Sequence, residues 1–239
     1  MVRKIVYLTI DDGPSKDMKK KADFLVSKGI PAVWNCRGDN LEKWPEHAIY
    51  LIKKGFIIGN HSYNHPYFSD LSLEQCFEEI QKTDRIIEKI YKRASIKRPV
   101  KFFRFPYGDK GGFNYLEFLK PYKGEGKIRK EKIQAFLRNL RYTQPKFENI
   151  TYRYYRKAGL LEDVDWLCTY DIMEYALDSL TKIFERMDEN VPEDGRGLNY
   201  PDSEEIIVTH DTPETTHIFE PIIDRILTKG MIFKLPLLK

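Results

Sequence analysis

Short apolar runs alternate along the chain with longer segments in which apolar residues recur at helical spacing. The apolar runs predict strands at residues 5–8, 30–34, 56–58, 100–103, 164–169, 205–209 and 231–233. The amphipathic segments predict helices at residues 16–28, 46–54, 73–93, 172–187 and 214–229. This order of strands and helices is typical of consecutive βα units, and it predicts a parallel sheet or a barrel.

Residue types at the predicted boundaries agree with this pattern. Ser72 and Gln75 have the spacing of a capping box, which predicts the start of a long helix. Three predicted helices end in a Lys-Gly pair, at Gly29, Gly55 and Gly230. Glycine is favoured there because the residue that follows a helix often adopts a left-handed conformation. An apolar run follows each pair at once, so these helices lead directly into strands.

Two segments interrupt the alternation. Residues 110–157 contain thirteen Lys or Arg and four Glu, a net charge of +9, whereas the whole chain carries +4. Residues 188–203 form a long polar stretch, and such stretches in compact domains often border a functional site. We therefore expect residues 1–239 to form a single α/β domain with a basic, helical insert at about residues 109–160.

The composition is that of a soluble globular protein. Hydrophobic residues make up 41% of the chain and charged residues 32%, and no stretch approaches the ~20 apolar residues of a membrane span. The N-terminus has no signal-peptide pattern, so we expect a cytoplasmic protein, or a secreted one if an export segment is missing from this sequence. Cys36, Cys76 and Cys168 are odd in number and far apart, which is typical of reduced thiols.

Polar residues able to carry chemistry follow several of the predicted strands. Asp11 and Asp12 follow the first strand, His61 and His65 the third, and His210 the sixth. In α/β proteins the functional site forms at the C-terminal ends of the strands. One acid could simply cap the helix that follows. Capping does not need two acids, however, so the adjacent pair favours a shared metal-binding or acid–base role.

The spacing of two histidines suggests metal ligands. His61 and His65 are four residues apart, so in one helical turn both imidazoles would face the same way. Pro66 disfavours helix at the preceding residue, so we expect a single turn or a tight loop. Two histidines and a carboxylate form a recurring catalytic zinc set with an open position for water. The alternative is a pair of capping or core histidines. His47 and His217 lie on predicted helices, where we expect ordinary surface or packing residues.

Five motifs in the sequence occur in the order found in a known family. They are Thr9-Ile10-Asp11-Asp12-Gly13-Pro14, His61-Ser62-Tyr63-Asn64-His65, Arg104-Phe105-Pro106-Tyr107-Gly108, Asp165-Trp166 and Ile207-Val208-Thr209-His210-Asp211. Together they resemble the motifs of the polysaccharide deacetylases, the NodB-homology enzymes of carbohydrate esterase family 4. The resemblance implies a distorted (β/α) barrel and the metal-dependent removal of N-acetyl groups from amino sugars. Ile10 stands where the family usually has Phe, an apolar exchange that should leave the chemistry intact.

The resemblance also implies a role for each matched residue. It implies one divalent ion, most often zinc, with cobalt, nickel or manganese as alternatives, on three ligands: Asp12, His61 and His65. The implied catalytic residues are Asp11 as general base, Arg104 as its partner, His210 as general acid, Asp165 as the acid that holds it, and Tyr107, whose backbone N–H would bind the oxyanion. The implied substrate-binding residues are Trp166 and Val208, which would line the acetyl pocket, and Pro106.

Elementary chemistry asks for the same set of groups. A bound divalent ion can lower the pKa of a water molecule to about 7 and polarise an amide carbonyl. A carboxylate beside that water can take its proton. The amine is a poor leaving group unless it is protonated, so a second titratable group is needed on the other side. An imidazole meets this need, because it titrates near neutral pH and a nearby carboxylate keeps it charged.

We therefore expect a hydrolase that removes N-acetyl groups from an amino sugar in an oligo- or polysaccharide of the chitooligosaccharide or peptidoglycan type. One alternative is a carbohydrate-binding homologue that has lost catalysis. Another is a hydrolase of a non-sugar amide on the same metal centre. The sequence leaves the oligomeric state open.

The basic insert allows two interpretations. It could attract an anionic partner, and its aromatic residues could stack on sugar rings. Alternatively, it is a solvated pair of helices whose aromatic residues pack onto the barrel. These residues are Phe113, Tyr115, Phe118, Tyr122, Phe136, Tyr142, Phe147, Tyr152, Tyr154 and Tyr155. Because no known nucleic-acid-binding motif is present, we expect a glycan rather than a nucleic acid as the partner.

Overall fold

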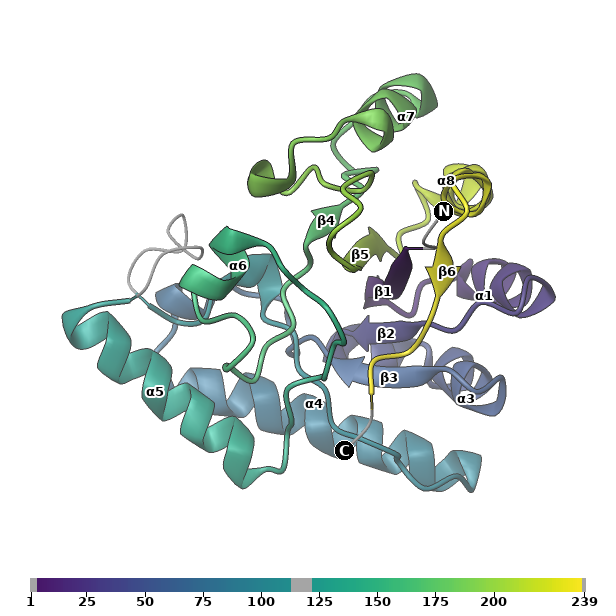
Figure 1. Ribbon diagram of the computed structural model, residues 1–239. Coiled ribbons are helices and arrows are strands. Elements are labelled where there is room, and N and C mark those ends of the chain that lie inside the picture. The colour runs from purple at the N-terminus through teal and green to yellow at the C-terminus, as the bar shows by residue number, and fades with distance from the viewer. Residues whose placement is uncertain (1–3, 113–121, 238–239) are drawn as a thin grey trace.

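The computed structural model describes residues 4–112 and 122–237, which form an α/β fold around a curved parallel sheet (Figure 1). The strands are β1 (Ile5–Gly13), β2 (Val33–Cys36), β3 (Ile57–Asn60), β4 (Tyr170–Asp171), β5 (Glu205–His210) and β6 (Ile232–Phe233). The order across the sheet is β3-β2-β1-β5-β4, and β6 pairs with the beginning of β1. Every pairing between these strands is parallel. The predicted parallel α/β architecture is therefore confirmed.

Helices connect the strands and cover the sheet. They are α1 (Met18–Ser27), α2 (Gly38–Lys43), α3 (Pro45–Lys53), α4 (Leu73–Ala94), α5 (Gly124–Asn139), α6 (Arg153–Lys157), α7 (Leu180–Asp188) and α8 (Thr216–Thr228). Figure 1 shows α1 and α8 together on one side of the sheet and α5 and α6 on the other. The predicted capping box at the start of α4 is present, with both of its hydrogen bonds. None of the helices in these two ranges is long and apolar enough to cross a membrane.

The central strand β1 is buried on both faces, as its continuous apolar run predicted. Val6, Leu8 and Ile10 belong to the apolar cluster that packs against α1, α3, α4 and α8. Tyr7 points the other way, into a second cluster that contains Val33, Phe102 and Trp166. Successive side chains of a strand face opposite sides, so one strand contributes to two cores.

The pairing of β1 with β5 brings two site residues together. In this register Asp11 is the partner of His210, five residues along from the pair Val6 and Glu205. Paired residues on neighbouring parallel strands point to the same face of the sheet. Asp11 and His210 therefore share one face at the C-terminal ends of their strands.

Two predicted elements in the second half of the chain are wrong. Residues 164–169 form no strand, and the short strand β4 follows them instead. The carbonyl of Trp166 accepts hydrogen bonds from Arg104, so it cannot join a strand ladder. The predicted helix at 172–187 begins only at Leu180, because Met173 is left-handed and its N–H is bonded to the Asp171 carboxylate. The predicted strand at 100–103 is reduced to one parallel bridge, between Phe103 and Asn60.

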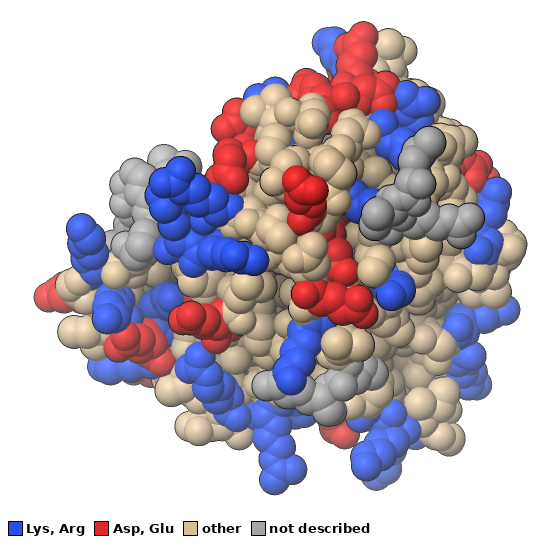
Figure 2. Space-filling view, viewed as in Figure 1, with Lys and Arg blue, Asp and Glu red and all other residues tan. Residues whose placement is uncertain are grey.

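The basic insert is helical, with α5 and α6 as its helices. Ile133 and Leu137 of α5 pack into a third apolar cluster. Several insert aromatics are buried against the barrel, with Tyr142, Tyr152 and Tyr155 almost fully covered. For the described residues this supports packing onto the barrel, whereas the aromatics Phe113, Tyr115 and Phe118 lie outside the described residues. Figure 2 shows Lys and Arg side chains, mixed with a few acids, over α5 and α6.

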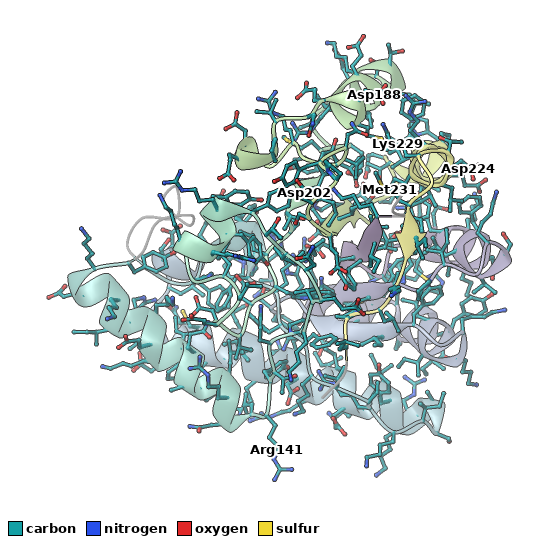
Figure 3. All side chains as sticks on the ribbon, in the orientation of Figure 1. Arg141, Asp188, Asp202, Asp224, Lys229 and Met231 are labelled. Carbon is teal, nitrogen blue, oxygen red and sulfur yellow. The ribbon has the colours of Figure 1, made fainter. Side chains whose placement is uncertain are left out.

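The polar stretch 188–203 is held by ion pairs to α8. Asp188 accepts hydrogen bonds from Lys229 at 2.6 Å and from Arg225 at 2.5 Å, and Lys229 also reaches Asn199 at 2.9 Å (Figure 3). At its far end, Glu205 is buried and bonded to Lys4 at 2.7 Å. These contacts fix the stretch at the end of the sheet opposite His210.

Candidate active site

Three predicted metal ligands converge at the C-terminal end of the sheet. His61 Nε2 and His65 Nε2 lie 3.1 Å apart. Asp12 Oδ1 lies 3.3 Å from the Nε2 of His65 and 3.9 Å from that of His61. Asp12 Oδ1 is buried, and it has no hydrogen-bond partner among the described residues. An acceptor that is buried without a donor indicates a missing positive charge at this point.

Two of the three separations, 3.1 and 3.3 Å, are close to those of a tetrahedral zinc site, and the one between Asp12 and His61 is longer at 3.9 Å. Ligand atoms about 2.0–2.1 Å from a zinc ion stand roughly 3.3 Å from one another. His61 is also in the tautomer that a metal ligand needs. Its Nδ1 donates to the Arg104 carbonyl at 2.8 Å, which leaves Nε2 as an acceptor. Burial lowers the pKa of His61 and of His65 to about 4. Both imidazoles are therefore neutral at pH 7, as metal ligands must be. The donor set fits a divalent ion.

Unusual backbone conformations bring these ligands together. The pairing of β1 with β2 is interrupted between Asp11 and Gly13, and Asp12 at the bulge has a φ of 68°. Neighbouring strand residues normally face opposite sides, so the bulge is what lets two adjacent acids serve one site. Ser62 and His65 are also left-handed, with φ of 63° and 60°. Residues 61–65 thus form a tight loop and not a helical turn.

The loop that carries the two histidines is fastened to α4. Glu79 accepts hydrogen bonds from the backbone N–H groups of Tyr63 and Asn64, each at 2.8 Å. The side chain of Asn64 donates to the same carboxylate at 3.1 Å. Ser62 Oγ accepts from the N–H of His65 at 3.1 Å, which closes the loop on itself. No sequence pattern indicates this role of Glu79, because it lies on a helix fourteen residues beyond His65.

Asp11 is buried and held as a carboxylate. Arg104 Nη1 donates to both of its oxygens at 3.1 Å, and Asn35 Nδ2 donates to Oδ1 at 2.7 Å. Burial alone would raise the pKa of Asp11, but the charge of Arg104, with that of His210, brings the pKa below its usual value. Asn35 was missed in the sequence, where a lone amide in a strand carries no motif.

The residue that holds His210 is Glu174, and not the predicted Asp165. Glu174 Oε1 lies 3.2 Å from His210 Nδ1 and also accepts a hydrogen bond from the backbone N–H of His210. Asp165 instead lies beneath Arg104, 3.8 Å from the buried Lys110 Nζ, and its Oδ1 accepts from the N–H of Phe105 at 3.4 Å. The contacts shown for Asp165 thus involve Lys110 and Phe105, whereas those of His210 involve Glu174.

Two carboxylates keep His210 charged. The carboxylates of Asp171 and Glu174 and a ring nitrogen of His210 lie within 4.8 Å of one another. Burial opposes the charged ring, but the hydrogen bond and charge of Glu174, followed by the charges of Asp171 and Asp11, raise the pKa of His210 to about 9. At pH 7 this imidazole is a cation whose Nδ1 faces Glu174, which leaves Nε2 for the substrate side.

Comparisons with known proteins agree with the motifs. A profile of the polysaccharide deacetylase family matches residues 1–114. Over this segment the chain is similar to the polysaccharide deacetylase family. Across 105 residues it is 33% identical to a peptidoglycan-N-acetylglucosamine deacetylase from Bacillus cereus, which covers 44% of this chain and 36% of that protein. The chain spans about a third or less of the length of the first curated relatives that it matches.

The structural neighbours show that the family fold extends over almost the whole chain. A peptidoglycan deacetylase from Bacillus subtilis aligns with a TM-score of 0.61 at 22% identity, covering 97% of this chain and 87% of that one. A carbohydrate esterase family 4 pseudoenzyme from Bacillus anthracis aligns with a TM-score of 0.64 at 17% identity, covering 97% and 63%. The family match includes Asp11, Asp12, His61, His65 and Arg104, whereas His210 and Glu174 lie beyond it.

The structure also places the remaining residues that the polysaccharide deacetylase motifs singled out. Tyr107 is left-handed, with a φ of 56°, and its ring lies 4.5 Å from that of His65. Pro106 is buried beside it. Trp166 and Val208, the expected acetyl-pocket residues, are almost wholly buried. The Trp166 ring lies 5.0 Å from the Arg104 guanidinium. Trp166 thus supports Arg104 through its ring and its carbonyl and forms no open pocket wall.

Proposed function

We propose that this chain is a metal-dependent hydrolase that removes the N-acetyl group from an amino sugar in an oligo- or polysaccharide. One observation carries the proposal: the ligand set Asp12, His61 and His65 lies beside an ionised acid, Asp11, which is paired with a charged imidazole, His210. Asp11 Oδ2 is 3.8 Å from His61 Nε2, and His210 is the partner of Asp11 on the adjacent strand. An amide hydrolase needs a base and an acid within reach of its electrophilic centre.

The residues of the centre divide the chemistry between them. A divalent ion held by Asp12, His61 and His65 would act as a Lewis acid toward water and the amide carbonyl. Asp11, fixed by Arg104 and Asn35, is positioned to accept the proton of the attacking water. The lowered pKa of Asp11 means that it is ionised and ready over the whole neutral range.

His210 supplies the proton that the leaving amine needs. His210 carries that proton at neutral pH, since its pKa is raised to about 9. Glu174 holds Nδ1, so the proton that is transferred sits on Nε2. The resemblance adds the backbone N–H of Tyr107 as a donor to the oxyanion. Fixed donors of this kind commonly lower the activation barrier by about 2.7–4 kcal/mol.

The substrate class rests on the relatives. The Bacillus cereus protein is named for the deacetylation of N-acetylglucosamine in peptidoglycan, and the Bacillus subtilis structure is also of a peptidoglycan deacetylase. We propose an N-acetylated glycan of the peptidoglycan or chitooligosaccharide type for this chain. Zinc is the proposed ion, with cobalt, nickel and manganese as the alternatives to test.

Acetate release from chitooligosaccharides and from peptidoglycan fragments tests the proposal. The purified protein should hold about one divalent ion per chain, by elemental analysis, and a chelator should abolish both the ion and the activity. His61→Ala should lose the ion and the activity together, because only two ligands would remain. His217→Ala is the matched control, since His217 is exposed on α8 and should leave both unchanged.

A rival function has support from one neighbour, the pseudoenzyme from Bacillus anthracis. A chain of that kind would bind a glycan and release no acetate. The intact pairs of Asp11 with Arg104 and of His210 with Glu174 favour catalysis. Stoichiometric metal and glycan binding, with no acetate from any N-acetylated glycan, would establish the rival.

A further inference from the structure

A second cluster of metal-ligating side chains surrounds the proposed general acid. Among the described residues, two groups of three side chains hold their ligand atoms within 4.8 Å of one another. One group is the ligand set described above, and the other consists of Asp171, Glu174 and His210. Both combine carboxylates with imidazole, which are donors that zinc accepts. Because the two groups share no residue, an ion in the second would be a separate ion.

The second cluster carries more negative than positive charge. His210 supplies one cation, and it faces the carboxylates of both Asp171 and Glu174. Within residues 4–112 and 122–237, neither carboxylate forms an ion pair with a Lys or Arg. Burial, together with the charge of Glu174, raises the pKa of Asp171 in spite of the opposing charge of His210. The cluster therefore has room for a further positive charge.

One oxygen of Glu174 marks the place of that charge. Glu174 is 5% exposed, and its Oε1 accepts hydrogen bonds from Thr209 Oγ1 and from the backbone and ring of His210. Its other oxygen, Oε2, is buried and has no hydrogen-bond partner among the described residues. Asp12 Oδ1 has the same property at the first site. A buried carboxylate oxygen without a donor indicates that a cation is missing beside it.

The other ligand atoms of the cluster are held in position. His210 Nδ1 lies 3.2 Å from Glu174 Oε1, close to the separation of roughly 3.3 Å between two ligands of one zinc ion. Asp171 is fixed by the N–H of Met173 at 2.8 Å and by the hydroxyl of Tyr175 at 3.2 Å, one on each oxygen. A carboxylate oxygen has two lone pairs, so each oxygen of Asp171 can still ligate an ion.

We propose that Asp171, Glu174 and His210 form a second divalent-cation site, and that an ion bound there inhibits the enzyme by disabling its general acid. The inhibition rests on the proposed function, whereas the binding does not. The ion has to displace the proton on Nδ1 of His210, so this site is weaker than the first and fills only in excess metal. With an ion on Nδ1, the ring could give up its Nε2 proton only by becoming an imidazolate. His210 then no longer protonates the leaving amine.

Zinc binding to the metal-free protein tests the site without substrate. Calorimetry, with elemental analysis after dialysis against graded zinc, should show about two ions per chain, the second bound about tenfold or more weakly than the first. Asp171→Asn should weaken the second ion about tenfold or more. It should leave the first ion unchanged, which also shows that the variant is folded.

Two further variants define which ion is which. Asp178→Asn is the matched control, because Asp178 is an exposed acid of the same segment, paired with Lys182 at 2.7 Å, and this variant should bind both ions as the wild type does. His61→Ala, which loses the first ion, should still bind one zinc ion in excess metal. Adding Asp171→Asn to His61→Ala should weaken that remaining ion about tenfold or more.

Acetate release at increasing zinc concentration then tests the inhibition. Wild-type activity should rise as the first site fills and fall about tenfold or more as the second fills. Asp171→Asn, compared with its own maximum, should need about tenfold more zinc for the same fall, and Asp178→Asn should follow the wild type.

The outcomes separate this inference from the proposed function. The inference is overturned if the wild type binds a single zinc ion, or if Asp171→Asn binds the second ion as tightly as the wild type does. Two bound ions with undiminished activity would overturn the inhibitory role. A second ion that depends on Asp171, in a protein that releases no acetate at any zinc concentration, would overturn the proposed function and support the site.

Discussion

Replacing Glu174 by Gln offers a direct test of how the general acid is kept charged. Glu174 Oε1 accepts hydrogen bonds from Thr209 Oγ1 at 2.6 Å and from the backbone and ring of His210. The amide oxygen of Gln can accept the same bonds, so the substitution removes the negative charge and keeps the shape. Any change in activity with pH can then be ascribed to the electrostatics of His210.

The magnitude follows from the pKa of His210. Its value of about 9 stands well above the 6.5 of an unperturbed histidine, and Glu174 is the first of the groups that raise it. With the charges of Asp171 and Asp11 still present, we expect the pKa to fall by about 1 to 2 units, each worth ~1.4 kcal/mol. The protonated fraction at pH 8.5 then drops roughly tenfold, whereas at pH 6 it changes by less than about twofold.

The assay is the pH dependence of kcat/KM for acetate release. Since the acid must be protonated, wild-type activity should be lost as pH rises through about 9. The lowered pKa of Asp11 places the opposite loss in the acid range, so the profile should be flat across neutral pH. Glu174→Gln should move the alkaline limb down by about one to two units and leave the acid limb in place.

Asp165→Asn is the control, because Asp165 is the acid that the motif predicted for His210. It lies against Lys110, and Arg104 is its other cationic neighbour, so removing its charge should leave the alkaline limb at its wild-type position. An unmoved alkaline limb in Glu174→Gln would refute the assignment of Glu174. A limb that moves in Asp165→Asn and not in Glu174→Gln would restore the pairing that the motif implied.

Two further substitutions test how the site is supported. In Gly59→Ala the new Cβ would lie 2.3 Å from Asn35 Oδ1, so Asn35 must shift away from Asp11. We expect kcat to fall and the free energy of unfolding to drop by about 1–3 kcal/mol. An unchanged kcat would contradict this role of Asn35. Lys21→Met removes the buried cation 3.1 Å from Asp211 and should cost about 3–5 kcal/mol in denaturant unfolding. Adding Asp211→Asn should recover part of that loss, and a double variant no more stable than the single one would contradict the ion-pair account.

The first half of the chain could be predicted well because its determinants are local. The apolar run before Asp11, the capping box at Ser72 and the Lys-Gly pairs are signals within a few residues of the elements they specify, and β1, α4 and β3 follow them. The second half depends on distant partners. The extended path at Trp166 is set by Arg104, which is sixty-two residues away in the sequence. No local pattern reveals that this carbonyl is taken and the strand displaced.

The pairing of His210 with Glu174 instead of Asp165 also depends on contacts between residues that are distant in the sequence. The resemblance implied Asp165 as the acid that holds His210, whereas in the structure Glu174 contacts its ring. The strand that adjoins β5 is β4, and the acids at its end are Asp171 and Glu174. The motif residues Asp165 and Trp166 instead bind Arg104 and its neighbour: the Trp166 carbonyl accepts from Arg104, and Asp165 accepts from the N–H of Phe105. A motif can therefore indicate which chemical groups an active site needs, whereas the fold determines which residues supply these groups. Here the outcome depends on Arg104, whose buried guanidinium binds the backbone carbonyl of Trp166.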